Sequence, residues 1–143
     1  KKSRFIACVG PAPTASDAFA FIAAASEPDA RHNCWAFRVG SDLTRSSDDG
    51  EPSGTAGKPI LASIERSGLS HVAVVVVRYF GGIKLGAPGL TRAYSNAASA
   101  CLKEAPRQRR LITTDIQICV PHNSMGSALA IVDKHKVINV EYR

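Results

Sequence analysis

The most hydrophobic segment of the chain is Val72-Ala73-Val74-Val75-Val76-Val77. A strand with one face in water alternates apolar and polar residues, whereas this one does not, so we expect both of its faces to be covered. The strand must therefore lie in the interior of its sheet. Two polar, glycine-rich loops bracket it, at residues 45–57 and 78–86. Because loops on a rigid scaffold often carry function, we look for the site there.

The flanking segments predict the other elements of an α/β domain. Residues 5–9 and 34–39 are short apolar runs that each end at a glycine, which is typical of strands. Thr14 or Ser16 can cap a first helix, which Pro28 ends. A second helix has Pro59 near its first turn and is capped by Gly68 at its C-terminus. The clearest helix spans residues 90–102, where apolar residues recur at i, i+3, i+4 and i+7. We expect this last helix to pack on the valine strand.

Beyond Ala105 the pattern changes. Residues 106–110, Pro-Arg-Gln-Arg-Arg, break the helical periodicity and predict a boundary between a main domain, 1–106, and a second piece, 107–143. Residues 112–120 and 138–142 alternate as half-buried strands do, and residues 124–132 carry a helical stripe. This β-α-β order resembles the first half of a ferredoxin-like unit.

Composition sets limits on the class of protein. Hydrophobic residues make up 45% of the 143 residues, as in ordinary globular domains, and no apolar run is long enough to span a membrane. The four cysteines are far apart, which favours a reduced, cytoplasmic protein over a disulfide or zinc scaffold. The formal charge of +6 permits an anionic partner such as RNA without requiring one. Nothing in the composition implies a cofactor.

The first loop carries three acidic residues, Asp48, Asp49 and Glu51. Their oxygens could hold a hard divalent ion and support metal-assisted hydrolysis. The alternative is that Asp-Asp-Gly and Glu-Pro form turns, with Arg45 or another cation paired to Asp48 or Asp49. The sequence around residues 54–59 lacks the spacing of a phosphate-binding loop, so nucleotide hydrolysis is unsupported.

The second loop interleaves cations with aromatic residues beside two glycines. This composition suits single-stranded RNA, because cations meet phosphates while aromatic rings stack on unpaired bases. The alternative is that the aromatic residues belong to the core and the glycines only turn the chain. The candidate nucleic-acid-binding residues are Arg78, Tyr79, Lys84, Arg92, Arg107, Arg109 and Arg110.

Two segments carry a family resemblance. Residues 45–61, Arg-Ser-Ser-Asp-Asp-Gly-Glu-Pro-Ser-Gly-Thr-Ala-Gly-Lys-Pro-Ile-Leu, and residues 76–86, Val-Val-Arg-Tyr-Phe-Gly-Gly-Ile-Lys-Leu-Gly, resemble the Impact/YigZ family. The resemblance covers residues 1 to about 105, including 32–36 and the helix at 90–102.

The resemblance implies a main domain similar to domain four of the translocation elongation factor. That is a two-layer α/β fold of the ribosomal-protein-S5-domain-2-like type with a left-handed crossover. It implies a ferredoxin-like second domain in bacterial-type members. Eukaryotic Impact proteins regulate translation under amino-acid starvation by competing for the scaffold that activates an initiation-factor kinase. That competition also uses an N-terminal partner-binding domain without a counterpart in these 143 residues, so the bacterial-type architecture is favoured. No enzymatic activity comes with the resemblance.

Taken together, these patterns predict a non-enzymatic cytoplasmic regulator of translation in starvation or stress. Its expected partner is ribosomal or other RNA, or a ribosome-associated, translation-regulatory protein. The alternatives are a metal-assisted hydrolase that uses the acidic loop and a pure protein-docking module. A basic open surface would favour RNA binding, whereas convergent carboxylates in a closed pocket would favour catalysis.

Overall fold

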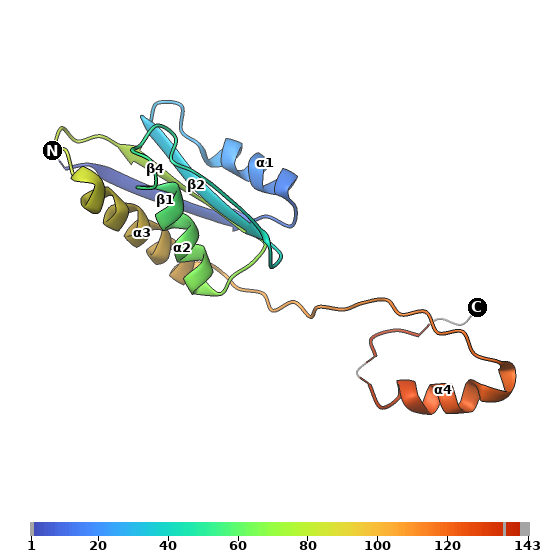
Figure 1. Ribbon diagram of the computed structural model, residues 1–143. Coiled ribbons are helices and arrows are strands. Elements are labelled where there is room, and N and C mark those ends of the chain that lie inside the picture. Colours follow the sequence, from blue (N-terminus) through green and yellow to red (C-terminus); the bar gives the residue numbers. More distant parts are fainter. Residues whose placement is uncertain (1, 136, 141–143) are drawn as a thin grey trace. The chain divides into compact units, whose positions relative to one another are not determined.

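The computed structural model describes residues 2–135 and 137–140, and the chain divides into two compact units, Lys1–Arg107 and Gln108–Arg143. The first unit is a mixed α/β domain (Figure 1). Its elements are β1 (Arg4–Pro11), α1 (Ala15–Ala25), β2 (His32–Val39), β3 (Leu43–Ser47), α2 (Gly57–Ser67), β4 (Val72–Tyr79) and α3 (Gly86–Glu104).

The valine strand, β4, is an interior strand, as predicted. The sheet order is β1-β4-β2-β3, and every neighbouring pair is antiparallel. All residues from Val72 to Arg78 are buried. Burying each valine contributes about 1.5–3 kcal/mol relative to exposure, so this strand is the main apolar anchor of the domain. Strand β3 was not predicted, because Leu-Thr-Arg-Ser-Ser has little apolar character.

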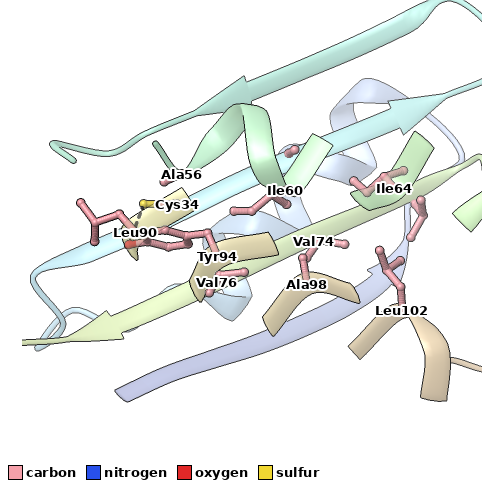
Figure 2. Packing of buried hydrophobic residues seen from close by; sticks show 12 residues of the cluster. Cys34, Ala56, Ile60, Ile64, Val74, Val76, Leu90, Tyr94, Ala98 and Leu102 are labelled. Atoms are coloured by element: carbon pink, nitrogen blue, oxygen red, sulfur yellow. Dashed lines mark hydrogen bonds between the residues drawn. The ribbon is translucent and has the colours of Figure 1, made fainter. Parts of the chain in front are cut away.

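Helices cover both faces of the sheet. On one face α2 and α3 lie side by side, and on the other lies α1 (Figure 1). Successive side chains of β4 point to opposite faces of the sheet, so they belong to two separate core clusters. Val72, Val74 and Val76 pack with α2 and α3, as Figure 2 shows for the last two, whereas Ala73, Val75 and Val77 pack against α1.

The two crossover connections have opposite hands. Strands β1 and β2 are both antiparallel to β4, so they run parallel to each other, and α1 joins them. Strands β3 and β4 are both antiparallel to β2, and α2 joins these. Two connections of the same hand would place both helices on one face, whereas α1 and α2 lie on opposite faces. One crossover is therefore left-handed, against the usual rule, in agreement with the family resemblance.

The helix ends follow from local chemistry. Thr14 forms a capping box with Asp17 at the start of α1, and Gly68 adopts the left-handed conformation that ends α2, as expected. Helix α3 begins at Gly86, and its buried residues Leu90, Tyr94, Ala98 and Leu102 face the sheet. The predicted packing of this helix on the valine strand is confirmed.

The second unit departs from the prediction. The helix expected at 124–132 forms as a short 3-10 turn, η1 (His122–Ser124), followed by α4 (Met125–Val132). The strand predicted at 112–120 does not form, nor do residues 138–140 form a strand; residues 141–142 lie outside the described residues. A strand needs a partner for its backbone groups, and a two-stranded pair is at best marginally stable in water. Ile112 and Ile116 are accordingly exposed.

Across residues 2–135 and 137–140, none of the helices is both long enough and apolar enough to cross a lipid bilayer.

Candidate functional site

The two loops that the sequence singled out meet through a buried ion pair. Nη1 of Arg78, at the end of β4, lies 2.5 Å from Oε1 of Glu51, in the loop before α2. Arg78 is 5% exposed and Glu51 is 8% exposed. Arg78 points to the α2/α3 face because it is two residues beyond Val76 on the strand. The expectation that Arg78 contacts RNA phosphate is therefore corrected, since its guanidinium is buried and already paired.

Tyr94 and Cys34 extend this pair into the core. The Tyr94 hydroxyl donates to Oε1 of Glu51 at 2.8 Å, and the Cys34 thiol lies 3.3 Å from that hydroxyl (Figure 2). Burial, aided by the neighbouring Glu51 and Asp49 carboxylates, raises the pKa of Cys34 to about 12 against the opposing effect of the Tyr94 hydrogen bond. Burial also raises the pKa of Tyr94, as do its Cys34 and Glu51 neighbours. Both groups are therefore protonated, and neither is an activated nucleophile.

His32 lies at the rim of this buried cluster. Its Nδ1 is 2.7 Å from the backbone carbonyl of Asp49, and a carbonyl only accepts, so Nδ1 carries a proton and donates. Its Nε2 is 3.9 Å from Oε1 of Glu51. The ring therefore links the acidic loop to the start of β2.

Asp48 caps helix α2. Its Oδ1 accepts hydrogen bonds from the backbone amides of Ala56 and Gly57 at 3.0 and 2.8 Å, and its Oδ2 accepts from Gly54 at 2.8 Å. Burial alone would raise the pKa of Asp48, but these three hydrogen bonds outweigh it and hold the pKa below the usual value. The carboxylate thus occupies the positive end of the helix dipole, a structural role.

Asp49 and Arg45, which also belong to the first loop, lie in different environments. Oδ2 of Asp49 accepts from the backbone amide of Asn33 at 2.6 Å, at the start of β2. Arg45 is exposed on β3, and the expected pairing of Arg45 or another cation with Asp48 or Asp49 is absent from the described ion pairs. Backbone amides satisfy these carboxylates instead, because the loop folds back over the start of α2.

The acidic loop therefore does not gather a metal site. Its three carboxylates face the α2 amides, the Asn33 amide and the Arg78 guanidinium respectively. Among residues 2–135 and 137–140, no three His, Cys, Asp or Glu side chains form a group that could hold a metal ion. The geometry does not favour the hydrolase alternative, because its acidic residues do not converge.

Exposed cations lie around the end of the sheet where β4 stops and β1 and β2 start. Arg4 pairs with Tyr79 across the sheet, and its guanidinium lies 4.9 Å from the half-buried Tyr79 ring. Phe80 is 45% exposed, and the Arg31 guanidinium lies 6.0 Å from its ring. Lys84 is exposed between Ile83 and Leu85. We use the name basic rim for the exposed cations at this end together with one exposed aromatic ring. The cations are Lys2, Arg4, Arg31, Lys84 and Arg92, and the ring is that of Phe80.

An open hollow of about 450 Å³ lies beside α3 at this end of the sheet. It is bounded by the start of β1, the segment before α3 and the first turns of α3, and both Lys2 and Arg92 line it. Two of the predicted RNA-binding residues, Lys84 and Arg92, therefore belong to one region of the surface. The chain leaves the sheet at Tyr79 and continues into α3, and the segment before α3 and the first turns of α3 both border the hollow.

The remaining predicted cations belong to other segments of the chain. Arg107 donates to the carbonyl of Leu102 at 3.5 Å, about 15 Å of helix axis from Arg92. Arg109 and Arg110 are exposed in the second unit. Sequence reasoning missed Lys2, Arg4 and Arg31 because they are distant from the two loops along the chain. The antiparallel pairing of β4 with β1 and β2 brings them together, and only that pairing signals it.

The fold and the two joined loops are those of an Impact-type domain. The family described as Impact N-terminal domain matches residues 1–102. A protein named "IMPACT family member in pol 5'region" from Thermus thermophilus is 48% identical over 126 residues, which cover 88% of this chain and 69% of that protein. The chain therefore belongs to the Impact family.

Two further comparisons agree with this assignment. "IMPACT family member YigZ" of Escherichia coli (strain K12) is 38% identical, and the match covers 100% of this chain and 74% of that protein. A solved structure described as "Crystal structure of an hypothetical protein" matches with a TM-score of 0.73 at 36% identity. The match covers 100% of this chain and 73% of the chain in that structure. The predicted family and mixed α/β fold are thus confirmed.

Proposed function

We propose that the protein is a non-enzymatic, cytoplasmic regulator of translation in starvation or stress that binds single-stranded ribosomal or other RNA through the basic rim. The observation that carries this proposal is the presence of five exposed cations at one end of the sheet, where the guanidinium of one of them, Arg31, lies 6.0 Å from the exposed Phe80 ring. The regulatory role is what the family resemblance implies. The cytoplasmic location is what the widely spaced cysteines favour.

The chemistry of the basic rim suits a flexible anionic chain. Lysine and arginine contact phosphates without regard to sequence, and an exposed ring stacks on any base. Phe80 is well placed for this, since its ring is open to solvent while the guanidinium of Arg78 lies 5.5 Å from its centroid and that of Arg31 lies 6.0 Å away. The buried cluster supports binding rather than catalysis, because its thiol, hydroxyl and carboxylates are protonated or already bonded.

The test is the salt dependence of RNA affinity. Fluorescence anisotropy with a labelled oligouridylate should give a log–log slope of affinity against salt of about −3 if four phosphates are neutralised. Lys84→Glu and Arg92→Glu should each weaken binding several-fold for oligouridylate and oligoadenylate alike. Lys103→Glu is the matched control, because Lys103 is exposed on the same helix as Arg92 but in its last turn.

Three results would contradict this proposal. The first is an RNA affinity that does not change with salt, and the second is the absence of measurable binding at low salt. The third is a loss of RNA affinity in Lys103→Glu as large as that in Arg92→Glu.

Docking of a ribosome-associated protein is a second candidate, favoured by the exposed apolar side chains of Ile83 and Leu85 beside the rim. It predicts ribosome association that persists in high salt and that Ile83→Asp abolishes. Such a result, together with absent RNA binding, would replace the first proposal.

A further inference from the structure

The hollow beside α3 combines apolar walls with a cationic edge. Phe5, Ile83, Leu85 and Ala93 supply apolar surface, while Lys2 and Arg92 line the edge. Asp and Glu are missing from its lining in the described chain. A ligand that fits this arrangement has a flat apolar body and negative charge on its flanks.

We propose that the hollow accepts one unstacked nucleobase of single-stranded RNA, with the adjoining phosphates held by Lys2 and Arg92. This inference rests on the proposed function and specifies the part of the ligand that the surface recognises. A nucleobase has the required flat apolar faces, and the phosphates on either side supply the negative charges. The hollow, at about 450 Å³, is large enough for a base and open enough for the strand to enter and leave.

The wall formed by Phe5 is rigid. Its ring makes an edge-to-face contact with Tyr94, with the centroids 5.1 Å apart, and the Arg78 guanidinium lies 5.6 Å from the Phe5 ring. Tyr94 and Arg78 are both fixed by hydrogen bonds to Glu51. The buried ion pair therefore braces an aromatic wall of the hollow. A ring held in this way loses little conformational freedom when a base packs on it.

Helix α3 forms the opposite wall. Gly89, Arg92, Ala93 and Asn96 are spaced at i, i+3, i+4 and i+7, so they lie on one face of the helix, and all of them line the hollow. Gly89 and Ala93 leave room because their side chains are minimal. Asn96 adds an amide with donors and an acceptor for a base edge.

The charge of the edge distinguishes a nucleotide from an uncharged apolar ligand. Lys2 and Arg92 line the hollow itself, and exposed Lys84 lies between two of its lining residues, Ile83 and Leu85. Three cations that form no ion pair within the described residues attract an anion and repel a basic peptide. This complementarity is why we place RNA, and not an apolar protein segment, in the hollow.

The experiment compares a labelled oligouridylate with an abasic strand of equal length and charge. Wild-type protein should bind the oligouridylate about a hundredfold more tightly, with about tenfold from the base in the hollow and about tenfold from a base stacked on Phe80. Ala93→Leu fills the hollow without changing charge, so it should lower this preference to about tenfold. Ala100→Leu, exposed on the same helix, is the control and should keep the preference.

Circular dichroism and urea unfolding would establish that Ala93→Leu folds. If it does not, titration of ¹⁵N-labelled wild type replaces it: the amides of Ala93, Asn96 and Ile83 should shift with oligouridylate and much less with the abasic strand. Retention of the full wild-type preference in folded Ala93→Leu, or equal wild-type affinities for the two strands, would overturn the base site. Salt-dependent binding of both strands would still stand in that case, so the proposed function would survive. Absence of binding to either strand would end both.

Discussion

Arg78 and Glu51, one residue from each polar loop, form a buried ion pair with their Nη1 and Oε1 atoms 2.5 Å apart. In the sequence, Glu51 directly follows Gly50, and Arg78 lies three residues before the Gly81-Gly82 pair. In the folded protein each residue neutralises the charge of the other, and the Tyr94 hydroxyl donates to the same carboxylate oxygen of Glu51. The pair fixes the loop before α2 to the end of β4. The exposed residues around that end are thereby held in place for binding.

Removing one partner of this pair should be strongly destabilising. Glu51→Gln keeps the shape of the side chain but leaves the Arg78 charge buried without a counter-charge. Breaking a buried pair in this way costs about 3–5 kcal/mol. The free energy of unfolding, measured in urea, should fall by that amount.

The control is Glu65→Gln, because Glu65 is exposed in the last turn of α2, away from the ion pair. It should change the free energy of unfolding by less than about 0.5 kcal/mol. A Glu51→Gln variant as stable as Glu65→Gln would show that the ion pair does not contribute to stability.

The Asp48 cap should make stability depend on pH in acid. Asp48→Ala removes the acceptor for three amides and should cost about 1–2 kcal/mol near neutral pH. The folded-state pKa of Asp48 lies below the reference value of 3.8, so its contribution is fully present above that value and is lost as pH falls through the folded pKa. The difference in stability between wild type and Asp48→Ala should therefore be constant from about pH 7 to pH 5 and shrink below about pH 4.

Urea titrations of both proteins across this range measure that difference. Asp49→Asn is the comparison, because it keeps an oxygen that accepts from the Asn33 amide and should cost much less. A difference that grows on acidification would contradict the assignment of Asp48 as the cap.

Much of the fold could be predicted because it depends on local pattern. The unbroken run at Val72–Val77 already requires two covered faces, and the stripe of α3 already requires a sheet to pack on. The strands predicted in the second unit were wrong because they depend on more than local pattern. Alternation at residues 112–120 shows that a strand could have one apolar face, but a strand exists only with a partner, and partners are not visible in a local pattern.

The site was less predictable, because the fate of a charge depends on where the chain brings its neighbours. Arg78 adjoins exposed residues in sequence, yet the alternation that places Val74 and Val76 under α3 also places Arg78 there. The face of the sheet on which Arg78 lies could therefore be predicted from the alternation of the strand. The partner of Arg78 could not, since Glu51 lies twenty-seven positions away in the sequence.

Cys34 should be unreactive in the folded protein. It has no exposed surface, and burial raises the pKa of its thiol to about 12, so almost no thiolate exists near neutral pH. Iodoacetamide should therefore modify the exposed Cys119 rapidly and Cys34 only after unfolding in urea. Peptide mass spectrometry would report both sites in one sample. Rapid modification of Cys34 in native protein, with Cys119 as the internal control, would contradict its burial.

Phe80, and not Tyr79, should stack on RNA. Both aromatic residues follow the valine strand, but Tyr79 is half-buried on the α1 face with the Arg4 guanidinium 4.9 Å from its ring, whereas Phe80 is 45% exposed. Phe80→Ala should weaken oligouridylate binding about tenfold, as loss of a stacked base does, and leave the salt slope unchanged because no phosphate contact is lost. Phe80→Trp should retain affinity. Tyr79→Ala should instead lower stability with little effect on the affinity of the folded protein. Anisotropy titrations at two salt concentrations separate these outcomes, and an equal loss of affinity in Phe80→Ala and Tyr79→Ala would contradict the assignment of Phe80 as the stacking residue.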